Sequence, residues 1–380
     1  MKLHVVALLL FCLSFTLAFS NPVWEQTNGP YAAQLIYIIS DSQGYLYTIT
    51  FSGNLYKSTN LGDIWTKLPV ENVIAIAFDK DNNCLIGNRF SEIYLYDKEL
   101  NFLKSLHVPY LGKSWVNQIQ IAKNDYIFAR FDSHLILSTD NGQSWKKIYY
   151  ELYFNFFIDS GNVIIITWYS GTIGRSSDYG QNWENIKIYD PQLNSGINNG
   201  AYNKCTDNFI IGCEDSIIYI SSDKGISWNK IKDSIPLKSI YDVMIDKNCD
   251  VYALGDDVCR STDGGNSWIK LKGLTGNSIN SITILDNKMY GSSGSNGIIK
   301  YDFNNESTTL NNNGILNSRI NCIDINQIGV VFGATQSGIF KTTNSGVEWK
   351  KLNYKHFQTN HLIQFIVLLT EIFILGMIPF

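Results

Sequence analysis

Six stretches of this chain repeat one eight-residue pattern: Ser or Thr, any residue, Asp or Asn, any residue, Gly, two further residues, and Trp. These octets occupy 58–65 (STNLGDIW), 138–145 (STDNGQSW), 176–183 (SSDYGQNW), 221–228 (SSDKGISW), 261–268 (STDGGNSW) and 342–349 (TTNSGVEW). Their closing tryptophans lie about 40 residues apart, or about twice that where one copy has decayed. Such a period, with strand-like sequence between the copies, is typical of a β-propeller with one blade per repeat.

The sequence between octets reads as three short strands separated by Gly, Asn and Asp turns. One repeat gives strands at 155–158, 163–168 and 172–175, and the tryptophan of each octet then opens a fourth strand. Aromatic residues make up 13% of the chain and charged residues 17%, which favours strands over long solvated helices. The sequence therefore predicts an all-β fold, a single propeller of four-stranded antiparallel blades with the octets between third and fourth strands.

The number of blades depends on two decayed copies, at 97–101 and 302–306, which keep the preceding strand and lose the tryptophan. With these copies, eight sets of three strands lie between 31 and 341. We therefore predict eight blades over 21–353, with seven as the alternative. Residues 23–26 resemble an isolated fourth strand, and Trp24 is expected to close the ring by joining the last blade.

The octet has the chemistry of a fixed turn. The carboxylate or amide oxygen at its third position can accept backbone N–H groups, the glycine can take a positive φ, and the tryptophan ring can bury a large apolar surface. We predict purely structural roles for these residues, namely Asn60, Asp140, Asp178, Asp223, Asp263 and Asn344 with Trp65, Trp145, Trp183, Trp228, Trp268 and Trp349.

The octet resembles the Asp-box, or bacterial neuraminidase repeat, of sialidases, some glycoside hydrolases, sortilin-type receptors and a photosystem II assembly factor family. In those families the box is a structural element at the blade periphery, so the resemblance implies no catalytic role. Sialidases also use three arginines, a tyrosine nucleophile and an N-terminal Phe/Tyr-Arg-Ile-Pro motif. This chain has no such motif and only five arginines, which disfavours a sialidase.

Function is expected at the axis, where the first strand of each blade begins. Three of these strands start alike, which places Asn117, Asn280 and Asn321 in equivalent positions that face the axis or satisfy backbone groups. We predict a ligand site from these amides together with Trp115 and Arg319. No catalytic group is assigned. A glycosidase with axial carboxylates, such as Asp242 and Asp324, is kept as an alternative.

Six cysteines follow the first twenty residues. The even number suggests pairing in an oxidising compartment, and Cys205 with Cys213 and Cys249 with Cys259 are the candidate disulfides; buried thiols are the alternative. The chain contains no Cys-x-x-Cys, and its histidines do not cluster with cysteines. We therefore expect no metal and no cofactor.

Both ends of the chain indicate the secretory pathway. Residues 1–20 have the positive start, apolar segment and small residues of a signal peptide. Residues 354–361 form a polar spacer and 362–380 a hydrophobic tail, which is read as a lipid-anchor signal, a membrane-spanning helix or neither. Asn305 begins a glycosylation sequon. We expect an extracellular or membrane-anchored protein.

These features favour a non-catalytic binding propeller that recognises a protein or glycan through its central funnel. The alternatives are the glycosidase and an assembly factor for a membrane protein complex. The net charge of −4, without a basic block, argues against nucleic acid as a partner. A monomer with a membrane contact through its C-terminal tail is expected.

Overall fold

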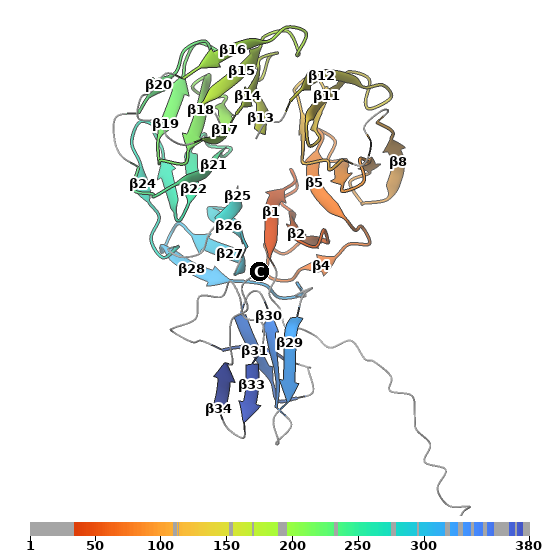
Figure 1. Cartoon of the computed structure of the whole chain (residues 1–380), viewed down its shortest axis with the longest axis vertical. Helices are drawn as coiled ribbons and strands as arrows, with labels where there is room; N and C mark the ends of the chain where they lie inside the picture. The colour runs from red at the N-terminus through yellow and green to blue at the C-terminus, as the bar shows by residue number, and fades with distance from the viewer. Residues whose placement is uncertain are drawn as a thin grey trace, which may run out of the picture.

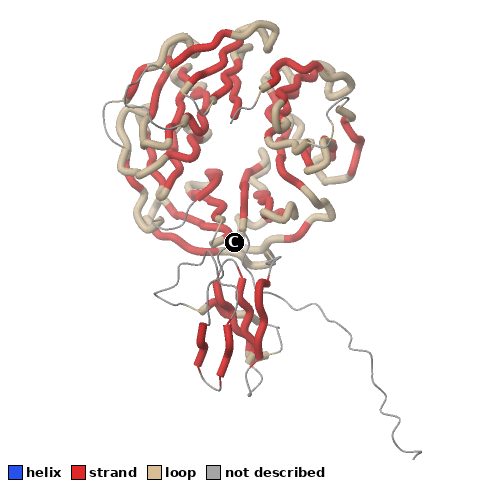
Figure 2. The backbone as a smooth tube through the Cα atoms, viewed as in Figure 1, coloured by secondary structure: helices blue, strands red, loops and turns tan. Residues whose placement is uncertain are grey.

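The computed structural model describes residues 34–374 apart from 109–111, 113, 152–154, 169–170, 189–195, 232–234, 275–278, 295, 316–319, 326–329, 336–337, 345–347, 353–364 and 369–370. The described residues form strands and loops only (Figure 2). They include no helix that is long and apolar enough to cross a membrane. The predicted signal peptide, the strand expected at 23–26 and the predicted polar spacer lie outside the described residues.

Seven four-stranded antiparallel sheets form the blades of a ring (Figure 1). In each blade the strands follow one another in chain order. Blades one to four comprise β1 (Leu35–Ser40), β2 (Leu46–Thr50), β3 (Leu55–Ser58) and β4 (Thr66–Lys67); β5 (Val73–Phe78), β6 (Cys84–Asn88), β7 (Ile93–Tyr96) and β8 (Phe102–Leu106); β9 (Gln118–Ile121), β10 (Ile127–Arg130), β11 (His134–Ser138) and β12 (Lys146–Tyr150); and β13 (Asn155–Ile158), β14 (Ile164–Thr167), β15 (Thr172–Ser176) and β16 (Glu184–Lys187).

Blades five to seven continue the same order. They comprise β17 (Ile197–Asn203), β18 (Asn208–Cys213), β19 (Ile218–Ser221) and β20 (Asn229–Lys230); β21 (Ile240–Ile245), β22 (Val251–Gly255), β23 (Val258–Ser261) and β24 (Ile269–Lys270); and β25 (Ile279–Leu285), β26 (Lys288–Ser293), β27 (Gly297–Asp302) and β28 (Ser307–Leu310). The octets connect third to fourth strands, as predicted.

An eighth sheet has the same strand order but lies outside the ring (Figure 1). It contains β29 (Ile320–Ile325), β30 (Val331–Thr335), β31 (Gly338–Thr342) and β32 (Lys350–Lys351), and a hairpin of β33 (Phe365–Leu368) and β34 (Glu371–Ile374) follows it. All eight predicted sets of strands therefore form sheets. The ring contains seven of them, so the alternative count of seven replaces the favoured count of eight.

Blade seven closes the ring directly on blade one. The Asn280 amide donates to the Leu35 carbonyl oxygen at 2.8 Å, and the Ser40 and Thr283 hydroxyl groups lie 2.9 Å apart. At the periphery the Trp65 N–H donates to the Asn313 carbonyl oxygen at 2.9 Å. These contacts join segments more than 240 residues apart and leave no place in the ring for an eighth blade.

The second strand of each blade is buried on both faces, because it lies between the first and third strands and between neighbouring blades. Strands β2, β6 and β22 are buried along their whole length. The apolar clusters accordingly join residues of adjacent blades, as where Leu85 and Ile93 of blade two pack with Ile119 and Ile136 of blade three. Each blade is therefore stabilised mainly by its neighbours.

Candidate functional site

The octets form the turns that the sequence predicts. In the second octet the Ser138 hydroxyl donates to Asp140 at 2.8 Å and accepts the Gly142 N–H at 2.8 Å. Asp140 also accepts the Ser144 N–H at 2.8 Å and the Ser144 hydroxyl at 2.6 Å. These bonds stabilise the ionised carboxylate and lower the pKa of Asp140 to about 2. The carboxylate thus stabilises its own turn by accepting these hydrogen bonds. With so low a pKa it is unsuited to proton transfer near neutral pH.

In the five octets between 58 and 268, two successive residues have positive φ, the fourth residue of the octet and the glycine after it. The glycine also packs against the preceding blade, and an added Cβ at Gly142 would lie 2.7 Å from a Leu106 side-chain carbon. The tryptophan N–H of Trp183, Trp228 and Trp268 donates to the glycine carbonyl of its own octet. The octet is therefore a rigid spacer between blades.

A cavity of about 300 Å³ lies on the axis and is lined by the first strands of six blades. Its lining comprises Tyr37, Ile74, Ala75, Ile76, Asn117, Gln118, Ile119, Gln120, Asn155, Asn199, Gly200, Asp242, Val243 and Met244. The residues that occupy the same place in their strands are Tyr37, Ala75, Gln118, Asn155, Asn199 and Asp242, and all but Ala75 are polar. One level of the axis is thus a ring of amide, phenol and carboxyl groups.

In blades one, two, five and six, a β-bulge near the start of the first strand determines which residue faces this cavity. The pairing register shifts between Ile197 and Asn199, between Ile240 and Asp242, and between Ile279 and Ser281. The residue at the bulge bridges to the next blade, as where the Asn198 amide donates to the Ile240 carbonyl oxygen at 2.7 Å. In blades five and six the residue after the bulge, Asn199 or Asp242, lines the cavity.

Asp242 is the one carboxyl group among the described residues that line the central cavity. Burial raises the pKa of this group to about 7, although hydrogen bonds from the Val243 N–H and the Asn199 amide oppose the shift. Burial and the nearby Asp242 together raise the pKa of Tyr37 to about 12. The cavity therefore presents amides, a neutral phenol and one carboxyl group that titrates near neutral pH.

The predicted ligand residues fall in different places. Asn117 lines the central cavity and donates to Asp132 at 3.0 Å. The Asn280 amide bridges to blade one, which is the backbone-satisfying role that the sequence left open. Asn321 belongs to β29 outside the ring, and Arg319 lies outside the described residues. Trp115 is 49% exposed.

Reasoning from sequence missed Gln118, Asn155 and Asn199 in the axial ring. For Asn199 the missing information was the bulge in β17, because it shifts the inward-facing position by one residue. A signal was nevertheless available: polar residues recur in otherwise apolar first strands, in Gln118-Ile119-Gln120 and in Asn198-Asn199.

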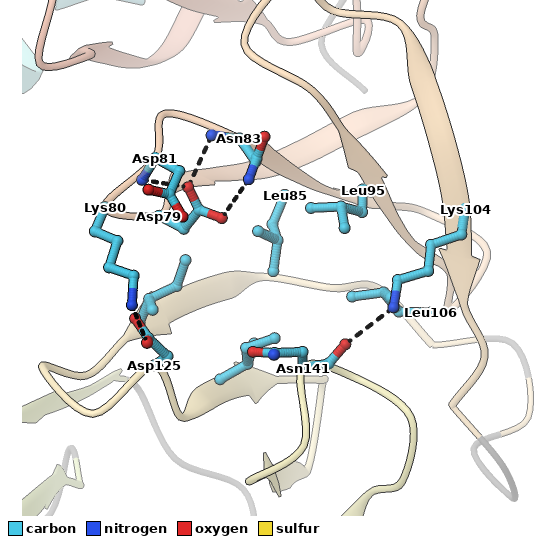
Figure 3. A pocket seen from close by; sticks show the side chains of 12 residues that line it. Asp79, Lys80, Asp81, Asn83, Leu85, Leu95, Lys104, Leu106, Asp125 and Asn141 are labelled. Carbon is cyan, nitrogen blue, oxygen red and sulfur yellow. Dashed lines mark hydrogen bonds and ion pairs between the residues drawn. The ribbon is translucent and has the colours of Figure 1, made fainter.

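A second cavity, of about 340 Å³, lies between blades two and three (Figure 3). Leucines form part of its wall, and charged residues lie at its rim. The rim groups already bind one another: Lys80 lies 2.6 Å from Asp125, and Asp79 accepts the N–H groups of Asp81 and Asn83. This cavity is formed by two blades, whereas the axial one is lined by six and collects polar side chains from five of them, so we take the axial cavity as the stronger candidate.

The disulfide joins two blades. Cys205 in the β17–β18 loop pairs with Cys249 in the β21–β22 turn. The predicted pairs within blades, Cys205 with Cys213 and Cys249 with Cys259, are therefore wrong; Cys213 and Cys259 are thiols buried in their blades.

Asn305 lies exposed in the β27–β28 turn, where glycosylation stays a prediction.

No protein-family model and no curated protein matches this sequence. Among solved structures, a catalytically inactive variant of virginiamycin B lyase from Staphylococcus aureus with quinupristin is similar (TM-score 0.58, 16% identity, 73% of this chain and 97% of that one). YCF48 bound to a D1 peptide is similar too (0.58, 13%, 73% and 96%). The extracellular domain of the putative one-component system BT4673 from B. thetaiotaomicron also matches (0.57, 11%, 86% and 53%). At these identities the likeness concerns the fold alone, and this chain is a β-propeller.

Proposed function

We propose that this chain is a non-catalytic binding propeller of the Asp-box type, acting outside the cytosol, and that its axial face recognises a segment of a protein partner. The supporting observation is the ring of Tyr37, Gln118, Asn155, Asn199 and Asp242, which offers hydrogen-bond donors and acceptors in a cavity of about 300 Å³. Amide groups of this kind suit the N–H and C=O groups of an extended peptide.

The chemistry of the cavity argues against the glycosidase alternative. Glycoside hydrolysis by the usual routes requires two carboxyl groups flanking one bond, about 5–10 Å apart. The described lining supplies Asp242 alone, and Asp324, the second candidate, belongs to β29 outside the ring. Two of the similar structures hold bound molecules, quinupristin in one and a D1 peptide in the other, which agrees with a propeller as a binding scaffold.

The extracellular setting is supported by the cross-blade disulfide and by the signal-like leader. The lipid anchor or spanning tail, the glycan at Asn305 and the monomeric state remain parts of this proposal. An assembly factor for a membrane complex is a more specific version of the same binding role. It predicts co-purification with integral membrane proteins.

The test uses the full chain expressed through the secretory route. Purified protein is screened against fluorogenic glycosides, a glycan array and a displayed library of random peptides, in parallel with an N155L/N199L variant of the axial ring. We expect enrichment of peptides that the variant no longer binds, and no glycoside turnover. Turnover that disappears in D242N, or binding to glycans alone, contradicts the proposal.

A further inference from the structure

Three large exposed aromatic residues are linked by one arginine, close in the chain to the lining of the central cavity. Phe51 is 64% exposed, Phe90 53% and Trp115 49%. Arg89 links them: its guanidinium donates to the Phe51 carbonyl oxygen, lies 5.3 Å from the centre of the Trp115 ring, and precedes Phe90 in the chain. We name these four residues the aromatic patch.

Trp115 is held outward by the backbone around it. Asp132 accepts the Trp115 N–H at 3.2 Å and the Ser114 hydroxyl at 2.9 Å, while the Ser114 N–H donates to the Ser91 hydroxyl at 2.6 Å. On the other side, the Val116 N–H donates to the Asn88 carbonyl oxygen at 3.0 Å. A half-exposed indole on a backbone that is held on both sides suits the role of an anchor for a partner.

The patch is continuous with the axial cavity. Asp132 binds the Trp115 N–H through one carboxylate oxygen and the Asn117 amide through the other, and Asn117 lines the cavity. These hydrogen bonds from Asn117, Ser114 and Trp115 outweigh the effect of burial and lower the pKa of Asp132. Trp115 in the patch and Asn117 in the cavity lining are therefore tied together by one carboxylate.

The charge of the patch defines the chemistry of its partner. In the described part of the chain, Arg89 bonds a carbonyl oxygen and forms no ion pair with a carboxylate, and its buried Nε has no hydrogen-bond partner. An arginine next to an aromatic ring complements an acidic group beside an apolar one.

We propose that the aromatic patch docks a partner protein segment in which a large apolar residue neighbours an Asp or Glu, with the apolar side chain against Phe51, Phe90 and Trp115 and the carboxylate on Arg89. This inference rests on the proposed function and specifies which part of the axial face makes the first contact and what it selects.

To test this, peptides of about a dozen residues that bind the full chain are selected from a random library and sequenced. Their affinities for the parent chain and for variants are then measured. We expect an aromatic or aliphatic residue beside an acidic one. W115A and R89Q should each weaken binding at least about tenfold, as anchor residues do. R89K should weaken it less, and Y150A, which removes another exposed aromatic residue, should leave it unchanged.

Folding of each variant is checked by its thermal unfolding transition. Peptides that bind N155L/N199L more weakly but bind W115A and R89Q as tightly as the parent chain would overturn this inference. That result would leave the proposed function standing. An absence of enriched peptides would overturn both. Glycan binding that W115A abolishes would show that the patch serves a sugar and would equally overturn the peptide assignment.

Discussion

At the scale of single residues, the octet aspartates couple folding to pH. The pKa values of Asp140 and Asp178 fall from 3.8 to about 2 because hydroxyl and N–H groups of the turn bind the carboxylates. A lowered folded-state pKa stabilises the fold above the unfolded value of about 4, and this contribution disappears as the pH falls through about 2. The first and last octets carry Asn60 and Asn344 in the same place, and these amide side chains do not titrate.

We therefore predict that D140N/D178N unfolds less steeply with acid than the parent chain. Asparagine keeps the acceptor oxygen, as Asn60 does for the Ile64 N–H at 3.0 Å. Thermal unfolding measured from pH 6 down to pH 2 should show the curves of parent and variant converging between about pH 4 and pH 2. D81N, on an exposed turn, is the control. Parallel curves over this range would contradict the assignment.

The pKa shift of Asp242 is opposite in sign to that of the octet aspartates. Its folded-state pKa of about 7 exceeds the unfolded value of 3.8, so the folded chain binds the extra proton and loses stability as the pH rises from about 4 to about 7. D242N removes the buried acid. We predict that it raises the free energy of unfolding at pH 8 by about 2–4 kcal/mol relative to the parent, and by little at pH 4. Urea titrations at both pH values measure this, and an equal difference at both would count against a buried carboxyl group.

At the scale of elements, equivalent turns of neighbouring blades lie side by side. Cys205 and Cys249 are 44 residues apart, which is close to one repeat, and this is why they meet across a blade boundary. Partners near in sequence, Cys205 with Cys213 and Cys249 with Cys259, would have placed each disulfide within one blade. In a propeller, residues one period apart are neighbours, and the repeat length was the signal that identifies this pair.

The disulfide closes a loop that contains one blade boundary. We predict that C205S/C249S lowers the free energy of unfolding by about 2–5 kcal/mol, because the unfolded chain regains the freedom that the crosslink removes. Chemical denaturation measures the loss. A reductant should destabilise the parent chain and leave C205S/C249S unaffected, and peptide mapping without reduction should recover the Cys205–Cys249 crosslink. A reductant effect of equal size on both proteins would contradict this pairing.

At the scale of the whole molecule, the octets and strand pattern were sufficient to predict the architecture of every blade. They were insufficient for the number of blades in the ring, because closure depends on which blade packs against blade one. The eighth set of strands has the same pattern as the others, including an octet at 342–349, and no local feature marks it as lying outside. The position of Asn280, one residue before the inward-facing place, likewise depends on the bulge and not on residue type.

Closure between β25 and β1 predicts how the chain tolerates truncation. The segment up to Ile315 packs on Trp65 in the core of blade one, whereas β29 to β34 lie outside the ring. A chain that ends at residue 316 should keep a cooperative thermal transition and its near-UV circular dichroism. A chain that ends at residue 278 loses blade seven with its Asn280 and Thr283 contacts, and should unfold at least about 5 kcal/mol more readily, since blade one then exposes its buried face. If the two truncations are equally unstable, the eighth sheet is required in the ring and the seven-bladed closure is wrong.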